Sequence, residues 1–111
     1  MAKFELFKRT DDQFHFHLKA DNGKIILTSE GYHAKDGAKN GIESVKKNAG
    51  NPAMYEVLES KDNQWYFNLK AGNGQVIGTS ETYTTFDNMN EGIALVEKYG
   101  PCAPVEDLTL S

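Results

Sequence analysis

The chain has 111 residues, of which 39% are hydrophobic and 25% charged, a composition typical of one soluble globular domain rather than a disordered segment. Its formal net charge of −4 lacks the basic excess of a dedicated nucleic-acid-binding protein. No apolar stretch suits a membrane span or signal peptide, and a single cysteine, Cys102, excludes an internal disulfide. We therefore expect a cytoplasmic protein without a membrane partner.

Residues 4–49 predict three strands followed by one helix. The strands are expected over residues 4–8, 14–20 and 24–28, and apolar and polar residues alternate in the second of them. Asn22-Gly23 predicts a type I′ hairpin turn in which both residues take positive φ.

The helix of this unit carries an apolar stripe. Ala38, Gly41, Ile42 and Val45 recur at the i, i+3, i+4 and i+7 spacing of one helical face. Asp36 is the predicted N-cap, and Asp87 is its equivalent further along the chain. Because glycine inside a helix costs about 1 kcal/mol relative to alanine, close packing of the helix on the sheet is the expected reason for Gly41.

The whole pattern returns at an offset of 51 residues, without a gap. Residues 55–100 align with residues 4–49, and about 19 of the 46 aligned positions are identical, which indicates duplication. We predict a single domain over residues 1–111, made of these two repeats and a C-terminal strand or tail over residues 101–111. Val105, Leu108 and Leu110 are the apolar residues that would dock this tail.

A unit of about 50 residues has little core of its own. We therefore predict an α+β fold in which tandem β-β-β-α(-β) repeats form one antiparallel sheet, with both helices packed on one face and pseudo-twofold symmetry. The second copy supplies what a dimer partner would, so a monomer is expected.

Three ordered motifs, each present in both halves, resemble those of the YegP-like family of small uncharacterised bacterial proteins. They are the Phe-x-Leu-Lys-Ala-x-Asn-Gly run, the Thr-Ser-Glu-x-Tyr run and the Gly-Ile-x-Ser-Val helix at residues 41–45, which reads Gly-Ile-Ala-Leu-Val at residues 92–96. The resemblance implies tandem β(3)-α-β motifs that share one sheet and exchange C-terminal strands. On that scheme residues 52–54 and 103–106 are the exchanged strands. It implies no activity, cofactor or catalytic residue.

Duplicated polar residues form the candidate binding site. They are Lys19, Ser29, Glu30 and Tyr32 in the first repeat, and Lys70, Ser80, Glu81 and Tyr83 in the second. They predict two equivalent patches, or one groove across the pseudo-twofold axis, in which hydroxyls donate hydrogen bonds and lysines attract anions. The structural alternative is that serine and glutamate satisfy backbone groups where the third strand ends, while tyrosine packs under the helix start.

Neither a metal nor a cofactor is expected. His15 and His17 lie about 7 Å apart on one strand face, and His33 is the nearest candidate for a third ligand, whereas a structural zinc site needs four. No catalytic motif is present, and Ser29 as a nucleophile would need His33 as its base. The sequence predicts no catalytic residues.

The leading hypothesis is a non-catalytic binding or interaction module, with a protein or peptide as its partner. One alternative is a small enzyme or ligand-processing protein that uses the duplicated serine, glutamate and tyrosine residues. Another is a weak nucleic-acid binder. Residues 1–50 carry nine lysines and arginines against seven acidic residues, and residues 51–111 carry three against nine.

Overall fold

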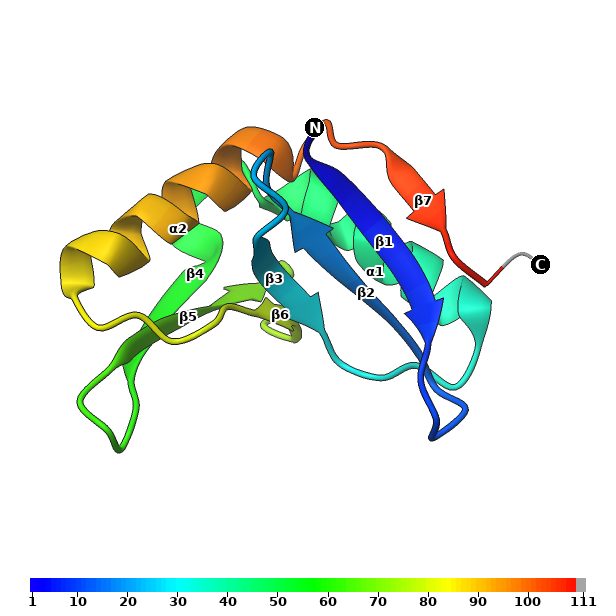
Figure 1. The fold of residues 1–111 in the computed structure, drawn as a ribbon, viewed down its shortest axis with the longest axis horizontal. Helices are drawn as coiled ribbons and strands as arrows, with labels where there is room; N and C mark the ends of the chain where they lie inside the picture. The colour runs from blue at the N-terminus through cyan, green and yellow to red at the C-terminus, as the bar shows by residue number, and fades with distance from the viewer. Residues whose placement is uncertain (110–111) are drawn as a thin grey trace.

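The computed structural model describes residues 1–109, and the elements found there follow the predicted order (Figure 1). They are β1 (Lys3–Lys8), β2 (Phe14–Lys19), β3 (Ile25–Ser29), α1 (Lys35–Asn48), the short 3-10 helix η1 (Pro52–Met54), β4 (Tyr55–Glu59), β5 (Trp65–Lys70), β6 (Val76–Thr79), α2 (Phe86–Tyr99) and β7 (Val105–Asp107). Leu110, predicted to help dock the tail, lies outside the described residues.

The strands form one sheet in the order β4-β5-β6-β3-β2-β1-β7. Two antiparallel meanders meet where β3 pairs with β6, and the equivalent residues Thr28 and Thr79 face each other there. The pseudo-twofold axis therefore passes between these two threonines. β7 pairs with β1 in parallel, so the sheet is mixed rather than wholly antiparallel. The predicted α+β fold of tandem repeats is confirmed.

The exchange of C-terminal strands occurs at one edge of the sheet. Val105 and Glu106, at the end of the second repeat, pair with Phe4 and Glu5 of the first. The prediction of a second exchanged strand over residues 52–54 is wrong, because Pro52–Met54 form η1. The chain enters β4 at the very next residue, so this segment has no length with which to reach the outer side of β4.

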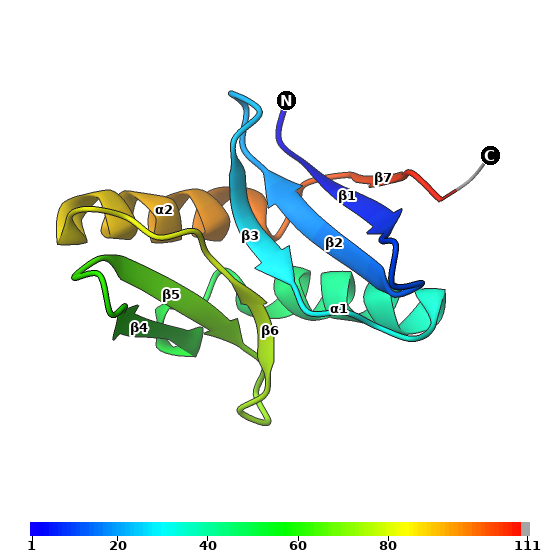
Figure 2. The same ribbon diagram turned by 60° about the horizontal axis from the view of Figure 1, so that its bottom comes forward.

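The hydrophobic core lies between one face of the sheet and both helices. Figure 2 shows α1 and α2 on the same side, behind β3. Each helix packs on both halves, since α1 contacts β2 and β6 while α2 contacts β5 and β3. The largest fully buried side chains come from both repeats: Phe4, Phe16, Phe67, Leu6, Leu18, Ile26, Leu27, Ile42, Leu69, Met89, Val45 and Val96.

A tyrosine lies under the middle of each helix, and the helical glycines make room for it. A Cβ atom at Gly41 would lie 2.5 Å from the Tyr32 hydroxyl oxygen and 2.8 Å from the Phe16 ring. At Gly92 the same atom would overlap the Tyr83 hydroxyl. Close packing does explain both glycines, and the nearest neighbour in each case is the tyrosine rather than the strand backbone.

The hairpin turn between β2 and β3 differs from the prediction. Positive φ is found at Gly23 and Gly74, with values of +82° and +85°, whereas Asn22 does not adopt it. The Gly23 amide donates to the Ala20 carbonyl, and the register of the two strands shifts before the turn. Glycine alone takes the left-handed position, and the asparagine side chain stays free to accept a hydrogen bond from the Lys24 amide at 3.0 Å.

The predicted helix caps are also wrong. The N-cap of α1 is Ala34, which gives no side-chain hydrogen bond, and that of α2 is Thr85, whose hydroxyl accepts from the Asn88 amide. Asp36 and Asp87 instead lie in the first turns, where their charges interact favourably with the helix dipole.

Candidate functional site

The predicted site residues lie in three separate places. The first contains the serines, whose hydroxyls are used by the fold. Ser29 Oγ accepts a hydrogen bond from the Phe16 amide at 2.9 Å and donates one to the Glu30 carbonyl at 2.8 Å. Ser80 repeats both contacts in the second repeat. The glutamate side chains that follow, at positions 30 and 81, are exposed, and only their backbone carbonyls take part.

The second place is the helix-free face of the sheet, where the lysines form ion pairs. Lys19 Nζ lies 3.0 Å from a carboxylate oxygen of Glu5, and Lys70 Nζ lies 3.1 Å from one of Glu56. His17 donates a further hydrogen bond to Glu5, and this bond, followed by that of Lys19, lowers the pKa of the Glu5 carboxyl to about 2. Both lysines are therefore compensated by a carboxylate that stays ionised at neutral pH.

These ion pairs belong to a polar row that crosses all seven strands on the helix-free face. The pairing registers place its members directly opposite one another in the order Glu106, Glu5, His17, Thr28, Thr79, Asn68 and Glu56. Within the row, the Thr79 hydroxyl donates to Asn68 Oδ1 at 2.8 Å. The side-chain hydrogen bonds between its members lie within each repeat, and the two repeats meet where the backbones of Thr28 and Thr79 pair.

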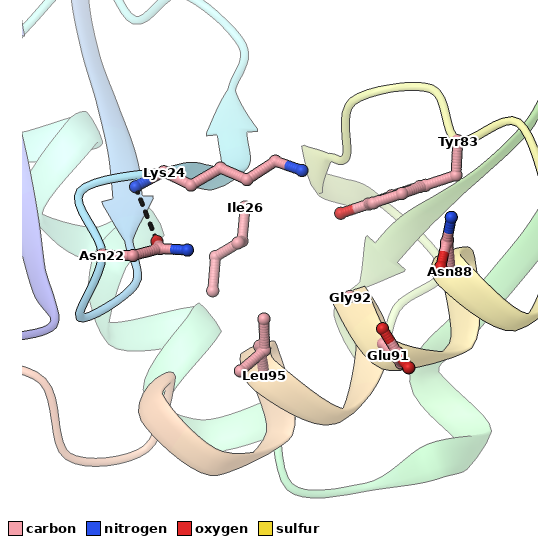
Figure 3. A pocket seen from close by; sticks show the side chains of 8 residues that line it. All are labelled: Asn22, Lys24, Ile26, Tyr83, Asn88, Glu91, Gly92 and Leu95. Atoms are coloured by element: carbon pink, nitrogen blue, oxygen red, sulfur yellow. Dashed lines mark hydrogen bonds between the residues drawn. The ribbon is translucent and has the colours of Figure 1, made fainter.

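The third place holds the tyrosines, and here the structure forms a pocket. We call it the first tyrosine pocket; it has a volume of 320 Å³ (Figure 3). It is lined by Asn22, Lys24, Ile26, Tyr83, Asn88, Glu91, Gly92 and Leu95. The β2–β3 hairpin of the first repeat forms one wall, and α2 with the tyrosine of the second repeat forms the other. Neither repeat builds this pocket alone.

A second tyrosine pocket, of 200 Å³, lies at the symmetry-related position. Its lining includes Tyr32, Gly37, Asn40, Gly41, Ser44, Asn73, Gln75 and Ile77. Each of these residues is the repeat equivalent of one that lines the first pocket. Duplication and symmetry have therefore produced two cross-repeat sites with the same framework.

Charged and hydrogen-bonding groups converge in the first tyrosine pocket. Lys24 Nζ lies 5.5 Å from the Tyr83 ring centroid, and Figure 3 shows the ammonium and the tyrosine hydroxyl pointing toward each other across the pocket. Glu91 contributes a carboxylate from α2. Burial, followed by the charge of Glu81, raises the pKa of Tyr83, which keeps its hydroxyl protonated and able to donate.

Across the described residues, two tyrosine hydroxyls outside the pockets donate to the protein, whereas that of Tyr66, which lines neither pocket, does not. Tyr55 donates to the Ala49 carbonyl and Tyr99 to Asp21. Within residues 1–109, the hydroxyls of Tyr32 and Tyr83 have no protein hydrogen-bond partner. A partly buried donor in a pocket without a protein partner is a group that a ligand can satisfy.

The two pockets differ in charge. Four positions change between equivalents: Lys24 is replaced by Gln75, Asn88 by Gly37, Glu91 by Asn40 and Leu95 by Ser44. The first pocket therefore offers one cation and one anion, and the second offers neutral amides and a hydroxyl. The framework is shared, but the two pockets present different charges.

The histidines do not gather into a metal site. His15 and His17 lie on the helix-free face, His33 is exposed, and no three histidine, cysteine, aspartate or glutamate side chains among residues 1–109 are placed to hold a metal ion. Cys102 is exposed. In the described part of the chain, neither helix is both long and apolar enough to cross a membrane.

The tyrosines were predicted from the sequence, but the residues that surround them were not. Asn22 and Asn73 were assigned to turns alone, and Lys24 and Glu91 carried no signal because they differ between the repeats. The duplicated Asn-Gly pairs were the one available indication. What brings them to the tyrosines is the antiparallel joining of β3 to β6, which places each hairpin beside the other repeat's helix.

The chain is similar to known bacterial proteins over nearly its full length. The domain of unknown function DUF1508 matches twice, at residues 10–56 and 60–107. A UPF0339 protein of Acinetobacter baylyi is 51% identical over 106 residues, which is 96% of each chain. The UPF0339 protein YegP of Escherichia coli K12 is 46% identical over 106 residues, again 96% of each.

Two solution NMR structures share the fold. That of a UPF0339 protein from Shewanella oneidensis has a TM-score of 0.91 and 47% identity, and the match covers 96% of this chain and 91% of that one. That of yegP from E. coli, described as a protein of unknown function, has a TM-score of 0.92 and 45% identity, with 96% and 92% covered.

Proposed function

Because this chain belongs to the YegP-like UPF0339 family and carries the DUF1508 domain twice, we propose that it is a non-catalytic binding module whose ligand sites are the two tyrosine pockets. The observation that carries the proposal is the unpartnered tyrosine hydroxyl in each pocket, between a hairpin of one repeat and a helix of the other. Such convergence of a few polar groups on a preformed concave site is typical of small-molecule recognition.

The ligand class follows from the size and charge of the first tyrosine pocket. Its volume of 320 Å³ is at the lower end for ligand sites and suits a molecule of amino-acid size. Lys24 attracts a carboxylate, Glu91 attracts an amine, and Tyr83 donates a hydrogen bond between them. A small zwitterion, such as a free amino acid or a dipeptide, satisfies all three groups.

A module without catalysis is supported by the serine hydroxyls, because the backbone of the fold occupies them. Ser29 and Ser80 each hold a strand amide and a carbonyl, so their oxygens are committed to the fold. A serine nucleophile needs a base within hydrogen-bond reach. Among residues 1–109 no histidine forms a hydrogen bond to either serine.

We further propose that the module acts as a monomer in the cytoplasm. The pseudo-twofold sheet already contains both halves that each tyrosine pocket needs, which removes one reason for pairing with a second copy. A free, exposed cysteine is usual where the surroundings are reducing.

The proposal is tested by exchanging the charges of the two pockets. The double variant Lys24→Gln with Glu91→Asn gives the first pocket the neutral groups of the second. We expect zwitterion binding there, followed by amide NMR titration with amino acids and dipeptides, to weaken at least about tenfold, because both ion pairs are lost. The reverse exchange, Gln75→Lys with Asn40→Glu, should create zwitterion binding at the second pocket.

The matched control for the tyrosine is Tyr66→Phe, which removes the same hydroxyl from a residue of β5 that lines neither pocket. Tyr83→Phe should weaken binding and Tyr66→Phe should not. Binding that is indifferent to the charge exchange and to Tyr83→Phe would overturn the assignment of the site.

A further inference from the structure

We propose that the open edge of β4 is a docking site for an extended segment of another protein, which adds to the sheet parallel to β4. The proposed site, called the β4 groove here, would lie between the β4 edge at Tyr55 and Val57 and α2 at Phe86 and Ile93, which are the repeat equivalents of the β1 and α1 residues beside β7. The partner segment carries apolar residues at two alternate positions facing α2 and basic residues around them. This inference is independent of the tyrosine pockets.

The same molecule contains a template for this interaction. At the opposite edge of the sheet, β7 lies parallel to β1, with Val105 opposite Phe4 and Asp107 opposite Leu6. Val105 also lies beside Ile42 of α1. By the symmetry of the repeats, the corresponding place beside β4 and α2 would take an eighth strand. Figure 2 shows β4 at the outer edge of the sheet with no strand beyond it.

Apolar side chains are more exposed at the β4 edge than at the β1 edge, as expected if the β4 edge lacks a covering strand. Leu6, covered by β7, is fully buried, whereas its equivalent Val57 is 40% exposed. Ile42 is 1% exposed, and its equivalent Ile93 is only partly buried. Phe86 is 46% exposed although it is a large aromatic residue, and its ring packs edge-on against Trp65 with centroids 5.2 Å apart. Apolar side chains that the first edge covers are thus open to solvent at the second.

The backbone of β4 offers open groups at Val57, whereas the Tyr55 amide already donates to the Pro52 carbonyl of η1. In β1, the Phe4 amide donates to the Pro104 carbonyl and the Leu6 carbonyl accepts from the Leu108 amide, so these groups point toward β7. β4 has the same register against β5 that β1 has against β2. The amide and carbonyl of Val57, the equivalent of Leu6, therefore point out of the sheet. Free edge groups of this kind are the template for strand addition.

The chemistry of the partner follows from the residues that differ between the edges. β7 is held by an ion pair between its Asp107 and Lys35 of α1, and by another between Glu106 and Lys3. The equivalents of these lysines are Phe86 and Met54. The β4 groove thus replaces both cations with apolar groups, so it favours an apolar side chain where β7 carries an aspartate.

The acidic charge of the second repeat indicates which residues of the partner segment would surround those apolar positions. The second half of the chain carries three lysines against nine acidic residues, and Glu56, Glu59 and Glu97 lie on β4 and the last turns of α2. Basic residues in the partner segment complement this rim. Within residues 1–109 no segment supplies such a strand, because η1 leads directly into β4, and β7 is acidic and already paired with β1.

The test uses two capped nine-residue peptides that differ at one position. The probe is Lys-Lys-Pro-Val-Lys-Val-Leu-Lys-Lys, and in the control peptide the second valine is aspartate, as in β7. In amide NMR titrations of the full chain, we expect the probe to shift Val57 and Ile93 and to bind at least about tenfold tighter than the control peptide. Phe86→Lys should reverse this preference, because it restores the cation that pairs with aspartate.

A second variant tests strand addition itself. Val57→Pro removes an amide that faces the open edge and leaves the ladder to β5 intact, so it should abolish peptide binding while the β5 and β6 amides keep their positions. Equal binding of the two peptides, or shifts away from β4 and α2, would overturn the proposal, as would no shifts up to about 1 mM peptide. Sedimentation that revealed a dimer dissolved by Val57→Pro would also overturn it, because the edge would then be an interface between copies.

Discussion

The ammonium group of Lys24 in the first repeat lies 5.5 Å from the ring centroid of Tyr83 in the second. This contact joins the β2–β3 hairpin of one repeat to the tyrosine that packs under the helix of the other. Because each tyrosine pocket is assembled in this way, the duplicated chain creates sites that one β-β-β-α unit does not contain. The proposed binding would therefore depend on the fold, since the pockets exist only where β3 joins β6.

The packing of the tyrosines under the helices predicts the effect of removing a helical glycine. Gly92→Ala should lower the free energy of unfolding by about 1–3 kcal/mol, although alanine favours helices, because the new methyl group would overlap the Tyr83 hydroxyl. Urea denaturation measures this change. Gly72→Ala is the control, because nothing lies within 4 Å of its added Cβ atom. Equal stability of the two variants would show that the tyrosine moves aside freely.

The serines are predicted to matter for stability. Ser29→Ala should cost about 1–3 kcal/mol, because it leaves the buried Phe16 amide without its acceptor. Ser80→Ala removes the same contact at a less buried position and should cost less. Chemical denaturation of both variants tests the order. If the variants lost ligand binding but not stability, the serines would have to be assigned to the binding site.

The fold was predictable because the alternation of apolar and polar residues indicates strands locally, and the same pattern occurs in both repeats. Phe16 and Leu18 alternate with polar residues, as do Phe67 and Leu69, and both sets are fully buried. The Asn-Gly turn was predictable as a turn but not in its backbone type, since glycine alone provides the positive φ. Likewise Thr85 was a better cap than Asp87, because its hydroxyl reaches the Asn88 amide.

The site was less predictable because strand geometry separates residues that are close in the sequence. Lys19 points to the helix-free face and pairs with Glu5, whereas Ser29 turns its hydroxyl to the neighbouring strand. Tyr32 leaves the sheet after a single bridge to Phe14 and packs under α1. Identity between the repeats marked all of these positions without distinguishing structural roles from binding roles.

The attachment of β7 should weaken in acid. Hydrogen bonds from Lys35, and then from Thr109, lower the pKa of Asp107 to about 2. Since the folded pKa lies below the ordinary value of 3.8, this stabilisation is complete above that pH and is lost as the pH falls through about 2. The NMR signals of β7 amides should therefore move toward unfolded positions between about pH 4 and pH 2.

The control for the acid effect is a pair of charge-removing variants. Asp107→Asn should loosen β7 already at neutral pH and remove its acid transition, whereas Asp62→Asn, in an exposed turn, should leave both unchanged. An unaltered acid transition in Asp107→Asn would mean that another group, such as Glu106 with Lys3, holds the strand.

A buried histidine is predicted to destabilise the chain. His15 is 7% exposed and stacks on Phe7, and both of its ring nitrogens are buried without a hydrogen-bond partner. The nearest carboxylate oxygen, of Asp11, lies 3.9 Å from Nε2, too far for a hydrogen bond. His15→Leu should therefore raise the free energy of unfolding by about 1 kcal/mol at neutral pH, because it removes a buried polar group that has no hydrogen bond. His33→Leu, at an exposed position, should change it by less than about 0.5 kcal/mol. A less stable His15→Leu variant would reveal a partner for the ring.

Ligand binding in the tyrosine pockets is best tested by amide NMR of the labelled full chain. The chain would be titrated with amino acids and dipeptides, with short oligonucleotides as a comparison. We expect shifts that cluster at Asn22, Lys24 and Tyr83, with weaker or different responses at Asn73 and Tyr32. Shifts confined to oligonucleotides and to the lysines of the first repeat, or a spectrum that no small molecule changes, would contradict it.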